Sequence, residues 1–331
     1  MKLPHRRQFL HLAAGAATLI FLTQTTLAQT WPSRPVTMVV PIAAGSSMDV
    51  LARILAARLS ELLGQSVIVE NVSGGGGVIG ASRVAKAAPD GYQLLFAGQD
   101  IMAQNQFIYK SLPYNSTTDF APVGLIVEAP FVLLVRKDLP VSSLQEFEAY
   151  AKRNQARMQY GSAGTGAGSH LACVLLNRAA GLDVTHIPYR GGAPAMQDLI
   201  AGRIDYQCSL AAVSLPQVES GTVKAIAVLT KERSEFQPSL PSAHEQGLTD
   251  LDVAAWFGFF VPKGTPAPIV ERLHAAILGT MATPSVAAKL FANGATVVSP
   301  QRRSPQYLQR LVETEIAKWG PIINAAGIKA E

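Results

Sequence analysis

The chain has 331 residues, of which 48% are hydrophobic and 15% are charged, and its formal net charge is +5. The first 28 residues hold three basic residues and no acid, so the remainder carries a net charge of only +2. A charge this small gives no argument for nucleic-acid binding. The remaining length of about 300 residues indicates two domains or one large one.

Residues 1–28 have the composition of a secretory signal peptide. The start is basic, residues 12–22 are apolar or small, and Thr26-Leu27-Ala28 is a small-residue cleavage site. The apolar run is too short for an ordinary membrane span, although an uncleaved anchor stays open as the alternative. Arg6-Arg7 fits a twin-arginine signal, so the Tat and Sec routes both stay open. We expect a periplasmic protein cleaved near Ala28.

Two cysteines, Cys173 and Cys208, remain after cleavage. An exported protein can form a disulfide between them. The sequence does not show whether their Cα atoms lie within bonding distance, and two buried thiols fit it equally well.

Strand-like and helix-like segments alternate in chain order and form three sections. The first section contains strands at 36–40, 66–70 and 92–97 and helices at 47–63 and 78–88. The second contains extended segments at 131–136, 158–162, 184–189, 204–210 and 223–229 and helices at 144–154, 169–181 and 193–202. The third contains one extended segment at 256–262 and helices near 266–280, 284–293 and 304–326. Apolar strands alternating with helices predict parallel sheets covered by helices.

The third section would make a poor domain alone, so we expect it to pack on the first. The predicted organisation is therefore one lobe of residues 29–129 plus 257–331 and a second lobe of residues 130–256. Extended crossovers near 128–132 and 254–258 would form a two-strand hinge. Two α/β lobes joined in this way enclose a cleft that can close on a small ligand.

Glycine- and serine-rich loops join strands to helix N-termini in both predicted lobes, as in residues 41–49, 72–77, 161–170 and 189–193. In open α/β sheets, ligands bind at these strand ends. Free main-chain N–H groups there carry partial positive charge, and they hold a carboxylate or a phosphate without lysine. Glycines that serve only as turns are the alternative explanation for any single loop.

Gly75, Gly77 and Gly80 also satisfy the G-x-G-x-x-G pattern of dinucleotide-binding proteins. Residues 71–73 separate this run from its strand, and the strand 92–97 ends without the acid that would hold a ribose. An exported compartment also holds little NAD. We therefore expect no nucleotide and no other cofactor.

Catalytic patterns are sparse. The chain has no G-x-S-x-G nucleophile elbow, and its His and Cys residues lack zinc spacing. A hydrolase using Ser162 or Ser169 would need an oriented base, and none is evident in the sequence. His186 is expected to be structural. We expect no catalytic residue and no metal site. Trp256 and Phe257 fit ligand contact and hinge packing equally well.

Several motifs in order resemble the solute receptors of tripartite tricarboxylate transporters, the Bug-type extracytoplasmic binding proteins. The resemblance covers residues 31–328 and rests on residues 31–49, 69–97, 160–172, 187–205, GFFVPKGTP and EIAKWG. It implies an α/β fold of the periplasmic-binding-protein type II, a Venus flytrap of two lobes. The opening loop departs from the family, because Ala43-Ala44 replace prolines and Ser46 replaces a glycine.

The resemblance also implies the ligand contacts and the function. The implied contacts are Ala44, Gly45, Ser46, Ser47, Asp49, Gly75, Gly76, Gly77, Gln99, Ser162, Ala163, Gly164, Thr165, Ser169, His170, Tyr189 and Ser209. Where relatives that bind amino acids carry an acid, this chain has Cys208-Ser209-Leu210. This favours a mono-, di- or tricarboxylate, aromatic ones included, over an amino acid.

The expected activity is capture of a small organic carboxylate and its delivery to the small and large membrane subunits of such a transporter. An exported sensor that presents its ligand to a signalling receptor is the alternative. We expect the protein to be a monomer and not to bind nucleic acid.

Overall fold

The computed structural model describes residues 31–235 and 237–329, so the signal-peptide prediction lies outside the described residues. The strands are β1 (Val36–Val40), β2 (Val67–Asn71), β3 (Gln93–Gly98), β4 (Phe120–Arg136), β5 (Gln159–Ser162), β6 (Thr185–Pro188), β7 (Tyr206–Leu210), β8 (Val223–Val228), β9 (Ala254–Pro262) and β10 (Thr296–Val297). The α-helices are α2 (Ser47–Leu63), α3 (Val78–Ala85), α4 (Asn105–Ile108), α5 (Leu144–Asn154), α6 (Gly168–Ala180), α7 (Gly192–Ile200), α8 (Ala211–Glu219), α9 (Ala267–Met281), α10 (Pro284–Ala292) and α11 (Pro305–Ala325). A π-helical turn, Asp100–Gln104, precedes α4.

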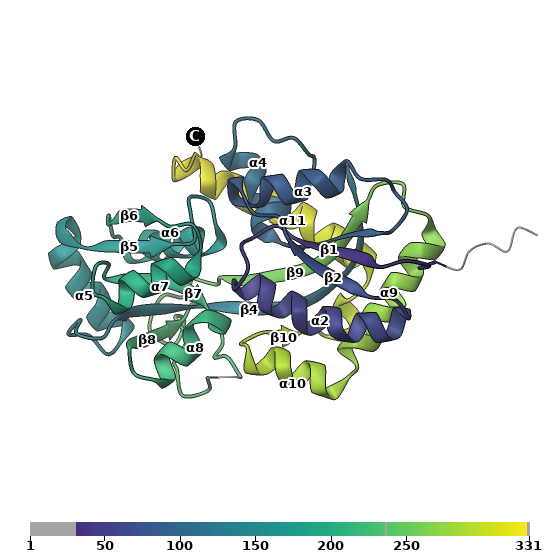
Figure 1. The fold of residues 1–331 in the computed structure, drawn as a ribbon. Helices are drawn as coiled ribbons and strands as arrows, with labels where there is room; N and C mark the ends of the chain where they lie inside the picture. The colour runs from purple at the N-terminus through teal and green to yellow at the C-terminus, as the bar shows by residue number, and fades with distance from the viewer. Residues whose placement is uncertain (1–30, 236, 330–331) are drawn as a thin grey trace, which may run out of the picture.

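The strands join in the order β2-β1-β3-β9-β4-β7-β5-β6, with β8 and β10 also pairing with β4. β1 lies parallel to β2 and β3, and β5 lies parallel to β6 and β7. β4 and β9 run antiparallel to their neighbours and link the two parallel sets (Figure 1). The sheet is therefore mixed where the alternation predicted parallel strands, because β9 runs antiparallel to β3, β4 runs antiparallel to β7, and the two connecting strands are antiparallel to each other.

β4 begins at Phe120, well before the predicted extended segment at 131. Its first part, FAPVGLIVEAP, contains two prolines and a glycine, which weaken the strand signal in the sequence. Register shifts between Pro122 and Gly124 and between Leu125 and Val127 accommodate them. Beyond residue 130, β4 instead pairs with β7 and β8. The same strand thus belongs to both halves of the molecule.

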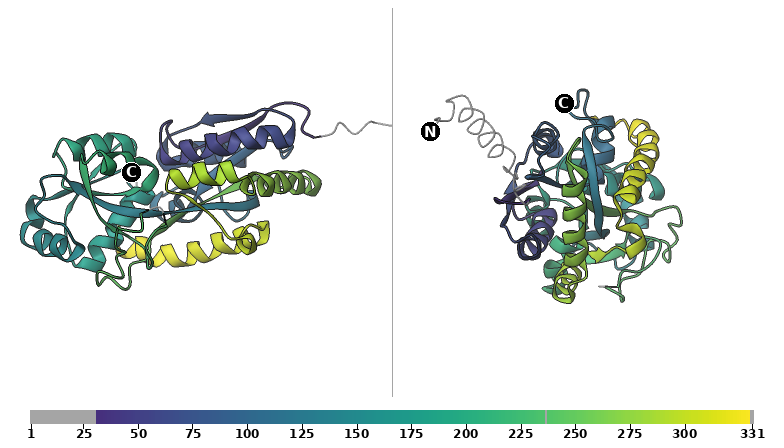
Figure 2. Two further views of the ribbon diagram at one scale, coloured as in Figure 1. Left: turned by 90° about the horizontal axis from the view of Figure 1, so that it is seen from below. Right: turned by 90° about the vertical axis from the view of Figure 1, so that its right-hand side faces the viewer.

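Helices cover the sheet on both faces. The apolar residues of α2 recur every three or four positions, and the buried ones include Leu51, Leu55 and Leu59. α2 packs against α9 and α10, whereas α11 packs against β4 and the π-helical turn. Figure 2 shows α2 and α11 on opposite sides of the first half. The third section of the chain therefore packs on the first, while the predicted lobe boundaries themselves stay a prediction.

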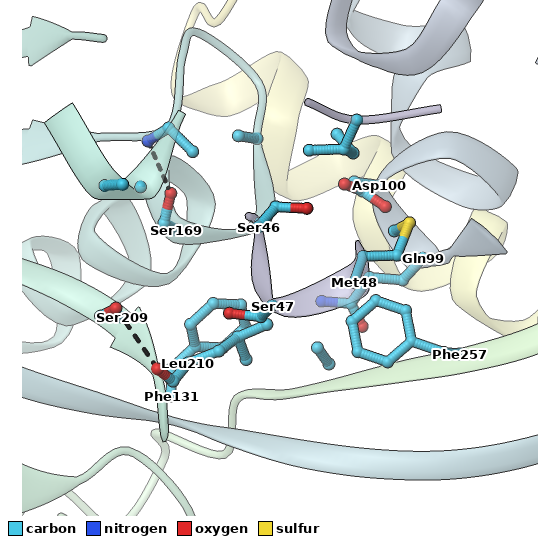
Figure 3. A pocket seen from close by; sticks show the side chains of 17 residues that line it. Ser46, Ser47, Met48, Gln99, Asp100, Phe131, Ser169, Ser209, Leu210 and Phe257 are labelled. Atoms are coloured by element: carbon cyan, nitrogen blue, oxygen red, sulfur yellow. Dashed lines mark hydrogen bonds between the residues drawn. The ribbon is translucent and has the colours of Figure 1, made fainter. Parts of the chain in front are cut away.

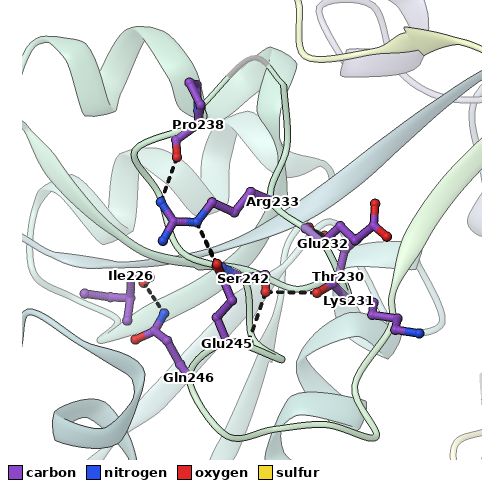
Figure 4. Close-up of polar contacts among 9 residues, drawn as sticks. All are labelled: Ile226, Thr230, Lys231, Glu232, Arg233, Pro238, Ser242, Glu245 and Gln246. Carbon is purple, nitrogen blue, oxygen red and sulfur yellow. Dashed lines mark hydrogen bonds and ion pairs between the residues drawn. The ribbon is translucent and has the colours of Figure 1, made fainter.

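The segment between β8 and β9 is fixed by polar contacts (Figure 4). Arg233 Nε donates to Glu245 Oε2 at 2.8 Å, and the main-chain N–H of Ser242 donates to the same oxygen at 2.8 Å. Gln246 Nε2 donates to the carbonyl oxygen of Ile226 on β8 at 3.0 Å. These contacts hold the chain against the sheet before it enters β9.

α8 was not predicted, because Pro216 lies inside it and proline normally ends a helix. The structure also joins Cys173 on α6 to Cys208 on β7 as a disulfide, with Cα atoms 5.5 Å apart.

In the described ranges no single helix is long and apolar enough to cross a membrane. The α9–α10 pair meets that test by length and composition only, with a bend of 74°.

The backbone conformation of residues 74–77 explains why all four are glycines. Its four φ angles are +133°, +54°, +57° and +90°, a conformation that other residues rarely adopt. A Cβ at Gly77 would lie 2.8 Å from the Ile101 side chain. The run forms a tight turn before α3 and packs against the segment after β3.

We predict that Gly77→Ala lowers the free energy of unfolding by about 1–3 kcal/mol, because it combines backbone strain with a steric clash. Gly181→Ala is the matched control, since Gly181 has φ of +64° but nothing within 4 Å of a Cβ. Urea unfolding of both variants gives the comparison. Equal losses would show that contact with Ile101 contributes nothing.

Candidate functional site

A pocket lies between the two halves, next to β4 and β9 (Figure 3). Its volume of about 110 Å³ is space for several water molecules or one small organic molecule. Six of the predicted contacts line it: Ser46, Ser47, Gln99, Ala163, Ser169 and Ser209. Phe257 lines it too, whereas Trp256 is buried outside the lining.

Ten further lining residues were not among the predicted contacts: Ile42, Met48, Asp100, Phe131, Ala167, Gly168, Gly192, Ala193, Leu210 and Ala255. Most of them belong to the glycine- and serine-rich loops described from the sequence or to the crossover strands. Only Gln99 separates Asp100 from the end of β3, and this position was the available signal for it.

Four helix N-termini converge on this pocket. Ser47 begins α2, Gly168 begins α6, Gly192 begins α7, and Leu210 is the N-cap of α8. Among the described residues, no side chain caps α6, α7 or α8 by a hydrogen bond. The first N–H groups of a helix lack partners within it and attract negative charge. The pocket therefore presents main-chain donors from several directions.

Asp49 does not line the pocket but shapes the loop beside it. Its carboxylate accepts hydrogen bonds from the Gly45 N–H at 2.9 Å, Arg53 Nε at 3.1 Å and Asn71 Nδ2 at 3.0 Å. Burial alone would raise the pKa of Asp49, but these hydrogen bonds outweigh it and lower the pKa. Asp49 thus holds residues 42–48 against β2. Ser46 Oγ accepts from the Asp49 N–H at 3.2 Å and caps α2.

The other predicted contacts also lie outside the lining. They are Ala44, Gly45, Gly75, Gly76, Gly77, Ser162, Gly164, Thr165, His170 and Tyr189. The Tyr189 side chain is instead held by Asp198, because its hydroxyl donates a hydrogen bond to Asp198 Oδ2 at 2.7 Å. Ligand contact by these residues stays a prediction.

Three stacked aromatic side chains support the loop 162–169. His170 and His186 stack with centroids 3.8 Å apart, and Tyr160 stacks on His186 at 4.9 Å. His170 Nδ1 accepts a hydrogen bond from the Gly166 N–H at 3.0 Å. The Ser169 hydroxyl accepts from the Ala163 N–H at 2.9 Å. The loop is therefore held at both ends.

His186 is also hydrogen-bonded to Ser162, with Nε2 and Oγ 2.7 Å apart. An oriented base next to Ser162 thus exists, although none is evident in the sequence. Ser162 is only 1% exposed and does not line the pocket, and its hydroxyl is within 3.1 Å of both the N and the O of Gly164. The pair therefore stabilises the loop, as expected for a structural His186.

The residues described form no group of His, Cys, Asp and Glu placed to hold a metal ion. The lining residues likewise include no lysine, arginine or histidine. Negative charge in this pocket would have to be met by N–H and hydroxyl donors.

Comparison with known proteins identifies the class. Residues 51–328 match the family model described as the tripartite tricarboxylate transporter family receptor. The structure of the periplasmic binding protein BugD is 37% identical, covers 91% of this chain and all of its own, and superposes with a TM-score of 0.85.

Two related structures contain ligands. MatC from Rhodopseudomonas palustris with bound malate is 38% identical over 88% of this chain and all of its own, with a TM-score of 0.83. A second R. palustris protein, solved with adipate, is 38% identical over 91% of this chain and all of its own, with a TM-score of 0.86. The predicted α/β periplasmic-binding-protein fold is confirmed.

The fold and the pocket are those of a periplasmic-type solute-binding protein. More specifically, the chain belongs to the tripartite tricarboxylate transporter receptor family, as the sequence motifs indicated. The family is periplasmic, and its members and these structural neighbours are substrate-binding receptors, not enzymes.

The histidine stack predicts acid sensitivity. Burial, with a smaller effect of His186, lowers the pKa of His170 to about 3, from 6.5. Below pH 6.5 the unfolded chain therefore binds a proton that the folded chain does not, so stability is full above this pH and is lost as pH falls. His170, at 6% exposed, accounts for about 2 kcal/mol between pH 6.5 and 5.

Urea unfolding of wild type and His170→Gln at pH 7 and pH 5 measures this loss. Burial raises the pKa of Asp100 to about 6, which acts in the opposite direction over this range, so only the difference between the two proteins isolates His170. The variant should lose less stability than wild type on acidification. Equal losses would contradict a neutral, buried His170.

Proposed function

We propose that the protein is an extracytoplasmic receptor that captures a small organic carboxylate between its two lobes and delivers it to a tripartite tricarboxylate-type membrane transporter. The observation that carries this proposal is the convergence of the N-termini of α2, α6, α7 and α8 on one pocket. Main-chain N–H groups there can donate charge-assisted hydrogen bonds to a carboxylate.

The rest of the lining suits the carbon skeleton of such a ligand. Phe131 and Leu210 lie together on one side of the pocket, and Met48 and Phe257 lie together on the other (Figure 3). A few oriented polar groups within an otherwise apolar wall are typical of small-molecule sites. Malate and adipate, bound by two relatives, are both small carboxylates.

In this proposal the protein is a monomer, exported after cleavage near Ala28. The lobes comprise residues 29–129 plus 257–331 and residues 130–256, and they close around the ligand through β4 and β9. The closed form is then the one that the small and large membrane subunits bind. A sensor would need the same closure, and a transport assay separates the two roles.

Proline substitutions test the main-chain donors. Gly168 and Gly192 are the first residues of α6 and α7, where proline is tolerated but removes the N–H. The preceding residues, Ala167 and Gly191, have ψ of 154° and 167°, which suit a following proline. We predict that Gly168→Pro/Gly192→Pro weakens carboxylate binding at least about tenfold.

The matched control is Gly168→Ala/Gly192→Ala, which adds side-chain atoms but keeps both N–H groups. Calorimetric titration with the tightest-binding carboxylate gives both affinities. If the alanine and proline doubles bind equally well, these N–H groups do not hold the ligand.

The whole proposal is tested by thermal shift of the mature protein with a panel of mono-, di- and tricarboxylates, and with phosphate and NAD as controls. A ligand at a hundredfold excess over its Kd adds about 2.7 kcal/mol of stability. Delivery is tested by uptake of the radiolabelled ligand into cells that carry the membrane subunits, with and without the receptor. Stabilisation by NAD or phosphate alone would contradict capture, and receptor-independent uptake would contradict delivery.

A further inference from the structure

The pocket contains a carboxylate side chain as well as N–H and hydroxyl groups that can donate hydrogen bonds to a ligand carboxylate. Asp100 lines it two residues after the end of β3, at the start of the π-helical turn. In Figure 3 its carboxylate points toward the Ser46 hydroxyl and lies across the pocket from Ser169 and Ser209. A carboxylate ligand therefore meets N–H donors on one side and a carboxylate on the other.

Asp100 has little to neutralise it. Its Oδ1 accepts a hydrogen bond from the Ile101 N–H at 3.0 Å. In the part of the chain that the structure describes, it takes part in no salt bridge, and no basic side chain lines the pocket with it. Burial raises its pKa to about 6, as expected for a carboxyl without a cationic partner. A second ligand carboxylate placed against it would be repelled.

The neighbouring residue is also unsatisfied. Gln99 is 3% exposed, and its Nε2 has no hydrogen-bond partner within the described residues. Buried amide donors are normally paired. Gln99 and Asp100 together therefore offer one free donor and one free acceptor to whatever occupies this side of the pocket.

We propose that Asp100 is a specificity-determining residue that selects carboxylates bearing a hydrogen-bond donor, a hydroxyl or an ammonium group, close to the carboxylate. The proposal rests on the function proposed above. The ligand carboxylate lies at the N-termini of α6, α7 and α8, its hydroxyl or ammonium group donates to Asp100, and Gln99 Nε2 donates to a ligand oxygen. An acid able to meet a ligand amine is thus present, although not at residues 208–210.

Matched ligand series test this selection. Succinate, malate and aspartate share one skeleton and differ in having hydrogen, hydroxyl or ammonium at C2. Propionate, lactate and alanine, and adipate with 2-aminoadipate, repeat the comparison at other lengths. Because hydrogen bonds to charged groups are stronger than neutral ones, at least one donor-bearing ligand should bind about tenfold or more tightly than its plain counterpart. The preferred member of the succinate and propionate series tells hydroxyl from ammonium.

Asp100→Asn tests the residue itself. It keeps the size of the side chain but removes the charge, so the plain dicarboxylate should bind more tightly and the preference for the donor-bearing ligand should shrink toward parity. Asp250→Asn is the control, since Asp250 is exposed and outside the pocket lining. It makes the same change in net charge and should leave the preference unchanged.

Each result can be assigned to one proposal. If plain carboxylates bind as tightly as their donor-bearing counterparts in every series, the role of Asp100 is wrong while the receptor function stands. The same holds if Asp100→Asn changes only the melting temperature and leaves the preference intact, because Asp100 would then serve only the helix start. If no carboxylate of these series or of the wider panel binds, both proposals fail.

Discussion

The site depends on unpaired main-chain N–H groups at the ends of helices. A helix of ordinary length leaves its first N–H groups without partners inside the helix, and they must meet a side chain, water or a ligand. Here α6, α7 and α8 begin at one pocket, and no side chain among the described residues caps them. Parallel strands produce this arrangement, because the helices that follow them all start at the same edge of the sheet.

Much of the surrounding sequence serves to shape loops and not to contact ligand. Asp49 binds the main chain of Gly45 and the side chains of Arg53 and Asn71, and in this way fixes the loop before α2. His170 and His186 do the same for residues 162–169. The glycine run 74–77 supplies four consecutive positive φ angles to a turn outside the pocket. A rigid frame lowers the entropy that ligand binding would otherwise cost.

The sequence predicted the regular elements well where apolar periodicity was strong, as in α2 and α5, and it predicted the loops that border the pocket. It missed the first part of β4 and all of α8, because prolines there are tolerated through register shifts and tertiary packing. The sequence of each loop did not show which of its residues would face the pocket. Asp49 and Tyr189 turn toward local partners, whereas Asp100, Phe131 and Gly192 line the pocket. That choice depends on backbone geometry that a single sequence does not specify.

The most direct test of this account is a crystal structure of the mature protein with its tightest-binding carboxylate. The account predicts a closed form in which carboxylate oxygens lie within hydrogen-bonding distance of main-chain N–H groups at the starts of α6, α7 or α8. A carboxylate held instead by an arginine or lysine side chain would contradict it.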